Sequence, residues 1–261
     1  MNILERLAEH SRRRAAADQE RIPAEEMRSL AKALGPGGGA AFTRALRRPG
    51  LSFLCEIKRA SPSKGIIAPD FPYLRIAREY EEAGANCVSC LTEPDFFLGS
   101  DAIFSEVRAE IRVPMLRKDF TVCAYQIDQA RVLGADAVLL IAALLEDREL
   151  AADLDRCAEL GLAALVETHD EAEIRRAVAV GARIIGVNNR NLKDFSVNLD
   201  NAARLRERVP ADRVFVAESG VAGPEDTAYL RRAGADAVLV GEALMRADNK
   251  KARLAELRGN L

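Results

Sequence analysis

The sequence predicts a (β/α)8 barrel that begins with a short helical extension. Two observations support this. Short apolar runs alternate with amphipathic stretches beyond Leu51, and several of those stretches end at a glycine that leads into the next apolar run. Such alternation is typical of β-α units around a parallel sheet. A chain of 261 residues, 49% of them hydrophobic, can form this barrel as one domain spanning 1–261.

Residues 1–48 are expected to form the N-terminal helical extension. Apolar side chains recur at intervals of three and four over 3–7 and again over 27–34, which predicts two helices. The glycine-rich run at 35–39 lacks the Gly-Lys-Ser/Thr ending of a phosphate-binding loop. We therefore expect a flexible connector there.

Beyond the extension, the pattern predicts eight strands separated by helices. The strands are expected at 51–58, 87–92, 114–118, 137–142, 163–167, 184–188, 214–218 and 237–241. The helices are expected at 73–83, 101–110, 124–133, 146–160, 170–180, 198–208 and 224–233. Glycine follows four of these helices, where it suits a left-handed C-cap. Eight such units can close into a barrel.

Composition argues against several classes of protein. A net charge of -2 with dispersed Lys and Arg provides no basic face for nucleic acid or a membrane surface. No run approaches the roughly 18 apolar residues of a membrane span, so we expect a cytoplasmic protein. The five cysteines favour reduced thiols, mostly buried in strands. Cys87 and Cys90 have C-x-x-C spacing, but no second pair completes a zinc site, and we expect two core cysteines.

Polar side chains stand at the ends of five predicted strands, on the same face as an apolar residue or glycine earlier in the strand. Barrel enzymes carry their chemistry at the C-terminal strand ends, and alternate residues of a strand share a face. The residues concerned are Glu56, Lys58, Lys118, Glu167, Asn188 and Glu218. Their convergence predicts an active site in which Glu56 and Glu218 are structural ion-pair partners. His169, two residues beyond Glu167, is expected to begin the next helix as part of its cap.

The last two strands are followed by glycine-containing turns, at Ser219-Gly220 and at Gly241-Glu242. In barrels this region binds phosphate on backbone N–H groups and at the positive end of a short helix. Ser61, in the first loop, is placed to add a hydroxyl. Glu242 would contribute its amide, because its carboxylate would repel a phosphate.

These stretches together resemble the indole-3-glycerol phosphate synthase family. The matching segments, in family order, are 56–65 (EIKRASPSKG), 91–94 (LTEP) with Phe97, 116–120 (LRKDF), 134–142 (GADAVLLIA), 165–167 (LVE), 186–190 (GVNNR), 217–220 (AESG) and 240–244 (VGEAL). They span the whole predicted barrel. The resemblance implies a carbon-carbon lyase of tryptophan biosynthesis that converts 1-(2-carboxyphenylamino)-1-deoxyribulose 5-phosphate to indole-3-glycerol phosphate, with loss of carbon dioxide and water.

The resemblance also implies roles for individual residues. Lys118 is similar to the general acid of the family, and a pKa lowered by other cations would suit it. Lys58 resembles the residue that engages the substrate carboxylate and assists dehydration. Glu167 looks like the carboxylate that handles protons, with a pKa raised by a hydrophobic setting. How these residues and Glu56 divide the proton transfers is left open.

The remaining implied roles concern binding and orientation. The implied catalytic set is Lys118, Glu167, Lys58, Glu56, Asn188, Glu218 and Ser219. The implied substrate-binding set is Ser61, Phe97, Phe120, Arg190, Gly220, Gly241 and Glu242. By the same resemblance, Phe97 and Phe120 form an apolar wall for the anthranilate ring, and Arg190 and Glu218, from the two sets, are flanking ion-pair members. The helix at 2–20 and the connector are expected to cap the site.

The resemblance implies no metal and no organic cofactor. The expected partner is a small-molecule sugar phosphate, with no nucleic acid and no membrane, and the chain is expected to be a monomer or a weak homo-oligomer. Two alternatives remain: another sugar-phosphate barrel enzyme such as phosphoribosylanthranilate isomerase, or a non-catalytic barrel that binds a phosphorylated ligand. The pair Lys58 and Lys118 argues against both, because neither needs two such lysines.

Overall fold

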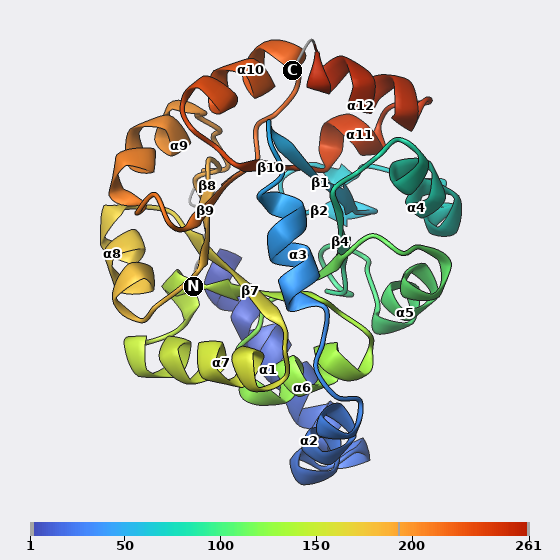
Figure 1. Cartoon of the computed structure of the whole chain (residues 1–261). Helices are drawn as coiled ribbons and strands as arrows, with labels where there is room; N and C mark the ends of the chain where they lie inside the picture. Colours follow the sequence, from blue (N-terminus) through green and yellow to red (C-terminus); the bar gives the residue numbers. More distant parts are fainter. Residues whose placement is uncertain (1–2, 193, 260–261) are drawn as a thin grey trace.

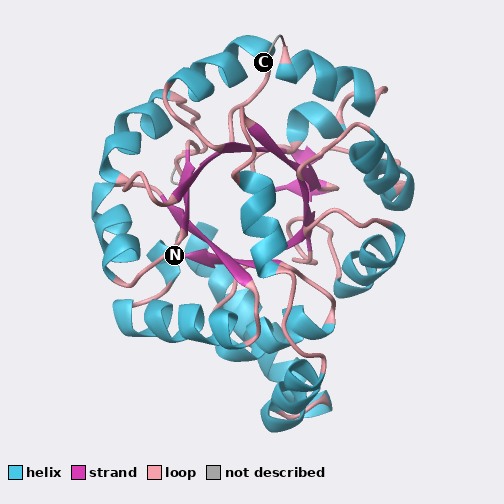
Figure 2. Ribbon diagram, in the orientation of Figure 1, coloured by secondary structure: helices cyan, strands magenta, loops and turns pink. Residues whose placement is uncertain are grey.

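The computed structural model describes residues 3–192 and 194–259, and within them eight parallel strands close into a barrel (Figures 1 and 2). The strands are β1 (Ser52–Ile57), β4 (Cys87–Leu91), β5 (Met115–Lys118), β6 (Ala137–Ile141), β7 (Ala163–Thr168), β8 (Ile184–Asn188), β9 (Val214–Glu218) and β10 (Ala237–Val240). Each pairs in parallel with the next along the chain, and β10 returns to β1. The predicted fold class and all eight strands are confirmed.

Helices surround the barrel, as Figure 2 shows. They are α4 (Tyr73–Glu82), α5 (Asp101–Glu110), α6 (Ala124–Val132), α7 (Asp147–Glu159), α8 (Glu171–Ala179), α9 (Asp200–Leu205), α10 (Pro224–Arg232), α11 (Glu242–Met245) and α12 (Lys250–Arg258), with 3-10 turns η1 (Ala142–Leu144) and η2 (Arg206–Arg208). The seven predicted helices are confirmed, although the 198–208 segment ends as η2. The four glycines expected as caps all have φ between 80° and 88°.

The N-terminal extension contains three helices: α1 (Ile3–Arg21), α2 (Ala24–Ala33) and α3 (Gly39–Leu46). The third was not predicted, and the flexible connector expected at 35–39 is wrong. The Gly39 amide donates to the Gly161 carbonyl at 2.9 Å, and a Cβ at Gly39 would lie 2.3 Å from the Ala163 nitrogen. Only glycine allows this close approach of two backbones.

Helix α3 closes the N-terminal end of the barrel and lies across the ring of strands in Figure 2. Phe42 and Leu46 are fully buried against inward-facing strand residues such as Leu116. Ser52, at the start of β1, donates to the Ala45 carbonyl at 3.0 Å. The opposite, C-terminal end of the barrel is therefore the end that can open to a ligand.

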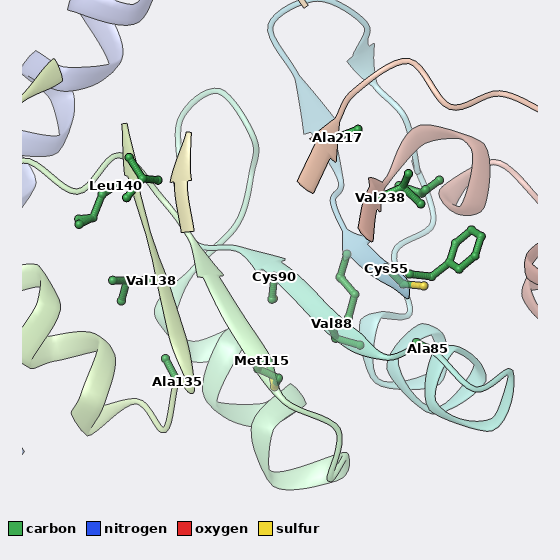
Figure 3. Close-up of a cluster of buried hydrophobic side chains, with 14 of the residues drawn as sticks. Cys55, Ala85, Val88, Cys90, Met115, Ala135, Val138, Leu140, Ala217 and Val238 are labelled. Atoms are coloured by element: carbon green, nitrogen blue, oxygen red, sulfur yellow. The ribbon is translucent and has the colours of Figure 1, made fainter. Parts of the chain in front are cut away.

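The core has two layers, because alternate residues of each strand face opposite sides. One layer fills the barrel interior, and the other lies between the strands and the helices, where Figure 3 shows Cys55, Val88, Cys90 and Met115. Cys87 belongs to the inner layer and Cys90 to the outer one. The two cysteines are therefore buried core residues, as predicted, and all five cysteines are free.

A two-stranded hairpin in the loop after β1 was not predicted. Its strands, β2 (Ala60–Ser61) and β3 (Gly65–Ile66), pair antiparallel and bring Ser61 back toward the C-terminal end of the barrel. In the part of the chain that the structure describes, no helix has the length and apolarity needed to cross a membrane.

Candidate active site

A cavity of about 920 Å³ opens at the C-terminal ends of the strands. All the catalytic and substrate-binding residues predicted from the sequence line it. From the strand ends these are Glu56, Lys58, Lys118, Glu167, Asn188 and Glu218, and from the loops they are Ser61, Phe97, Phe120, Arg190, Ser219, Gly220, Gly241 and Glu242. The structure thus brings together side chains from both ends of the sequence, because every strand of a parallel barrel ends at the same rim.

Glu167, at the end of β7, is the centre of the polar network. Lys118 Nζ, from the end of β5, lies 3.3 Å from Glu167 Oε2. Asn188 Nδ2, from the end of β8, donates to Glu167 Oε1 at 3.1 Å. His169 Nε2 lies 3.3 Å from the same oxygen, within ion-pair distance of it. Three elements therefore fix one buried carboxylate.

A second charge pair faces this network from β1. Lys58 Nζ donates to Glu56 Oε1, and Glu56 is buried. Gly241, after β10, makes room for the pair, since a Cβ there would lie 2.5 Å from Glu56 Oε1 and 3.0 Å from Lys58 Nζ. The ion pair predicted for Glu56 is present.

The charge states of the central pair differ from the expectation. Burial opposes the charge on Lys118, but the surrounding carboxylates outweigh it and raise the pKa of the amine above its usual value. Burial likewise opposes the charge on Glu167, but Lys118 and His169 lower the pKa of that carboxyl. The predicted lowered pKa for Lys118 and raised pKa for Glu167 are both wrong, because each group lies beside an opposite charge that stabilises its ionised form.

The carboxyl group of Glu218, at the end of β9, is protonated and is not paired with any cation that the structure describes, contrary to the prediction. Burial, followed by repulsion from Glu167, raises the pKa of the Glu218 carboxyl to about 8. Its buried Oε1 has no hydrogen-bond partner among the described residues. Arg190 donates to the Phe195 carbonyl at 3.1 Å. The ion pairs predicted for Glu218 and Arg190 are therefore absent from the described part of the chain.

The turns after β9 and β10 form the candidate phosphate seat. Ser219 and Gly220 have φ of 66° and 96°, so the backbone turns sharply at the cavity wall. The first N–H groups of α11, after Gly241, have no carbonyl partner within the helix. The Glu242 carboxylate lies 3.0 Å from Arg246 and 3.7 Å from Lys64, so two cations balance its charge beside the seat.

The opposite wall of the cavity is apolar. The rings of Phe97 and Phe120 lie 6.0 Å apart at an angle of 40°. Glu93, buried after β4, shapes the loop that carries Phe97: its carboxylate accepts from the backbone N–H groups of Phe96 and Phe97 at 2.8 and 2.9 Å. The sequence did not single out Glu93, because nothing local shows that its carboxylate binds backbone.

Helix α1 lines the same cavity with Ile3, Leu4 and Leu7. Farther along, α1 is attached to the strand end beside Lys118, because Arg14 Nη2 donates to both carboxylate oxygens of buried Asp119 at 2.7 Å. The expectation that the first helix caps the site is confirmed. The same expectation for the connector is wrong, since it lies against the loop before β7, at the end of the barrel that α3 closes.

His169 is the polar neighbour of the site whose contacts the sequence missed. It lies one residue before Asp170, which is the N-cap of α8 and accepts from the Glu173 amide at 2.9 Å. Its ring points to Glu167. Within residues 3–192 and 194–259, no three His, Cys, Asp or Glu side chains are placed to hold a metal ion.

Comparisons with known proteins agree with this geometry. Residues 4–257 match the family model for indole-3-glycerol phosphate synthase. The indole-3-glycerol phosphate synthase of Lachnoclostridium phytofermentans is 49% identical, over 99% of this chain and 100% of the relative. That of Lactiplantibacillus plantarum is 50% identical, over 84% of this chain and 85% of the relative.

Two solved structures share the fold at low sequence identity. The thiamine phosphate pyrophosphorylase from Pyrococcus furiosus is 19% identical, with a TM-score of 0.62 over 82% of this chain and 96% of that structure. A 3-hexulose-6-phosphate synthase is 18% identical, with a TM-score of 0.62 over 80% and 98%. These two show the barrel alone. The family match and the curated relatives show that the chain belongs to the indole-3-glycerol phosphate synthase family.

Proposed function

We propose that this chain is a carbon-carbon lyase that closes 1-(2-carboxyphenylamino)-1-deoxyribulose 5-phosphate to indole-3-glycerol phosphate in tryptophan biosynthesis. Membership of the family supports the proposal. The observation that carries it is the pair of Lys118 and Glu167, 3.3 Å apart, in a cavity that also holds the pair of Lys58 and Glu56. Two ammonium groups and two carboxylates suit a reaction with several proton transfers.

The cavity offers a surface for each part of this substrate. The backbone of 219–220 and of Gly241 suits the phosphate. Lys58, across the cavity, suits the carboxylate on the ring. The anthranilate ring would lie against Phe97 and Phe120, with Leu4 of α1 completing the apolar side. Held this way, the ring carbon and the ketone carbon are brought within reach of one another.

The charge states support distinct roles for the two central residues. In ring closure, the ring carbon that bears the carboxylate attacks the ketone carbon, and the ketone oxygen takes a proton from Lys118, whose raised pKa keeps it charged. Loss of carbon dioxide returns the bonding electron pair to the ring. The new hydroxyl then leaves as water with a proton from Lys58, while Glu167, with its lowered pKa, accepts a proton from the carbon beside the nitrogen. The cycle takes up one proton from solvent.

The test, with purified chain and no added metal, is to follow indole-3-glycerol phosphate formation from the deoxyribulose compound by its fluorescence, and the loss of phosphoribosylanthranilate in a separate reaction by chromatography. We expect turnover of the deoxyribulose compound and none of phosphoribosylanthranilate, which is the substrate of the rival isomerase. Turnover of the second compound alone would overturn the proposal. No turnover of either, by chain shown to be folded by circular dichroism, would favour the non-catalytic alternative.

We further propose that the chain works in the cytoplasm as a single domain, as a monomer or weak homo-oligomer, without nucleic acid. Five free cysteines fit a reducing compartment. Because α3 and α1 pack against the barrel, we expect the extension and the barrel to unfold in a single transition. Light scattering after size exclusion tests the assembly, and two separate calorimetric transitions would contradict the single domain.

A further inference from the structure

The ring of His169 lies between two carboxylates from different elements. Its Nδ1 is 3.0 Å from Glu173 Oε2 in α8, and its Nε2 is 3.3 Å from Glu167 Oε1 in β7. The same Glu173 oxygen accepts from the His169 backbone N–H at 2.8 Å, and Asn201 of α9 donates to the His169 carbonyl at 3.3 Å. The residue is therefore held on both its backbone and its ring.

This placement favours the doubly protonated ring. A neutral imidazole carries one N–H and one lone pair, so it would turn a lone pair toward one of the two carboxylates. An imidazolium presents an N–H to each. Glu173 is thus placed to orient the ring and to balance its charge, as carboxylates commonly do for functional histidines.

We propose that His169 is a positioning residue: as an imidazolium braced by Glu173, it holds the Glu167 carboxylate ionised and aimed into the cavity. The role goes beyond the proposed function and rests on it only for what Glu167 does. With His169 and Asn188 on Oε1 and Lys118 on Oε2, neither oxygen can rotate away without losing a partner. Removing the ring leaves Oε1 with Asn188 as its one partner among these three groups.

The local charges agree with this arrangement. Burial opposes the charge on His169, but the contacts with Glu167 and Glu173 outweigh it and raise the pKa of the ring to about 10. Lys118 of β5 pairs with the other oxygen of Glu167. At longer range the ring lowers the pKa of Glu218 of β9, which burial and Glu167 nevertheless keep raised.

The first part of the test measures the ring directly. The chain contains two histidines, so the His10→Asn variant leaves His169 as the single histidine, and its ring C–H signals can be followed by NMR against pH. We expect a midpoint above 8. In this background Glu173→Gln keeps an acceptor for the backbone N–H but removes the charge, and we expect it to lower the midpoint by one unit or more, about the effect of one adjacent charge. A midpoint at or below about 6.5 in the parent would overturn the proposal.

The second part separates positioning from a purely structural role. In Glu173→Gln we expect kcat to fall on the alkaline side at the pH where NMR shows His169 losing its proton, while KM stays within twofold. His169→Gln should lose about tenfold in kcat at every pH, without that alkaline limb. The melting temperatures of both variants check that they fold. The positioning role would be refuted if kcat of Glu173→Gln depended on pH as in its parent although the His169 midpoint of the variant had moved. Failure of the wild-type chain to turn over substrate would instead refute the proposed function, and the NMR result would stand.

Discussion

Replacing Gly186 by alanine should damage the site although no charged residue is replaced. Gly186 lies in β8, and a Cβ there would be 2.1 Å from Glu218 Oε1 and 3.2 Å from Leu165 Cδ1. Because Cβ contacts under 3.0 Å are essentially never found, the Glu218 carboxylate must retreat by about 1 Å. Glu218 and Leu165 are both buried, and the added methyl group would be tight against each of them.

Two effects follow from that displacement. Overpacking a barrel interior costs about 1–3 kcal/mol of unfolding free energy. Moving a group in the active site by about 1 Å lowers the rate on the order of 100-fold. We expect Gly186→Ala to show both, measured as a lower urea midpoint and as a lower kcat in the fluorescence assay.

A second glycine provides the matched control. Gly50 has φ of 87° and open space around it, so Gly50→Ala strains the backbone without meeting a neighbour. It should lose about 1 kcal/mol of stability and keep the parental kcat. If Gly186→Ala kept the parental kcat, or lost no more of it than Gly50→Ala, the argument from the Glu218 contact would be refuted.

Three further predictions concern charged side chains. Lys118→Met should lower kcat by two or more orders of magnitude, about what one general acid contributes, with an unchanged circular dichroism spectrum; full activity would refute the role of Lys118. Because burial raises the pKa of Glu218 from 4.5 to about 8, the folded chain binds this proton more tightly than the unfolded chain. The stability that this bound proton contributes is fully present below about pH 4.5 and is lost as pH rises through about 8. Glu218→Gln has no such proton, so its melting temperature should drop less over that range than that of the parent. Equal drops would contradict this. Arg14→Ala removes one partner of buried Asp119, which keeps Thr92 and Arg117, and should cost about 2 kcal/mol in urea unfolding, whereas Arg13→Ala breaks an exposed pair and should cost less than about 1 kcal/mol; equal losses would contradict the buried pair.

Much of the fold was predictable because its signals are local. The strand at 184–188 and the helix at 101–110 were placed with the bounds that the structure has. Helix α3 was missed because its glycine-rich start has no helical signal of its own. It is fixed by the backbone of the loop before β7, more than a hundred residues later in the chain.

The candidate site was predictable as a set of residues, but its chemistry was not. Lys118 and Glu167 are 49 residues apart, and nothing in either stretch shows that they pair. Once they pair, Glu167 raises the pKa of Lys118, which nearby cations were expected to lower. Lys118 in turn lowers the pKa of Glu167, which burial was expected to raise. The place of His169 beside the cap of α8 was predicted correctly, but the contact of its ring with Glu167 at a strand end was not, because its sequence neighbours describe only the cap.

The sequence by itself determined the order of strands and helices, the family, and which side chains stand at the strand ends, because alternation along a strand and glycine after a helix are short-range rules. Tertiary structure decided which carboxylate is ionised, which keeps its proton, and which histidine ring reaches the site. Those properties depend on distances between charges and on burial, and the closure of the barrel sets both.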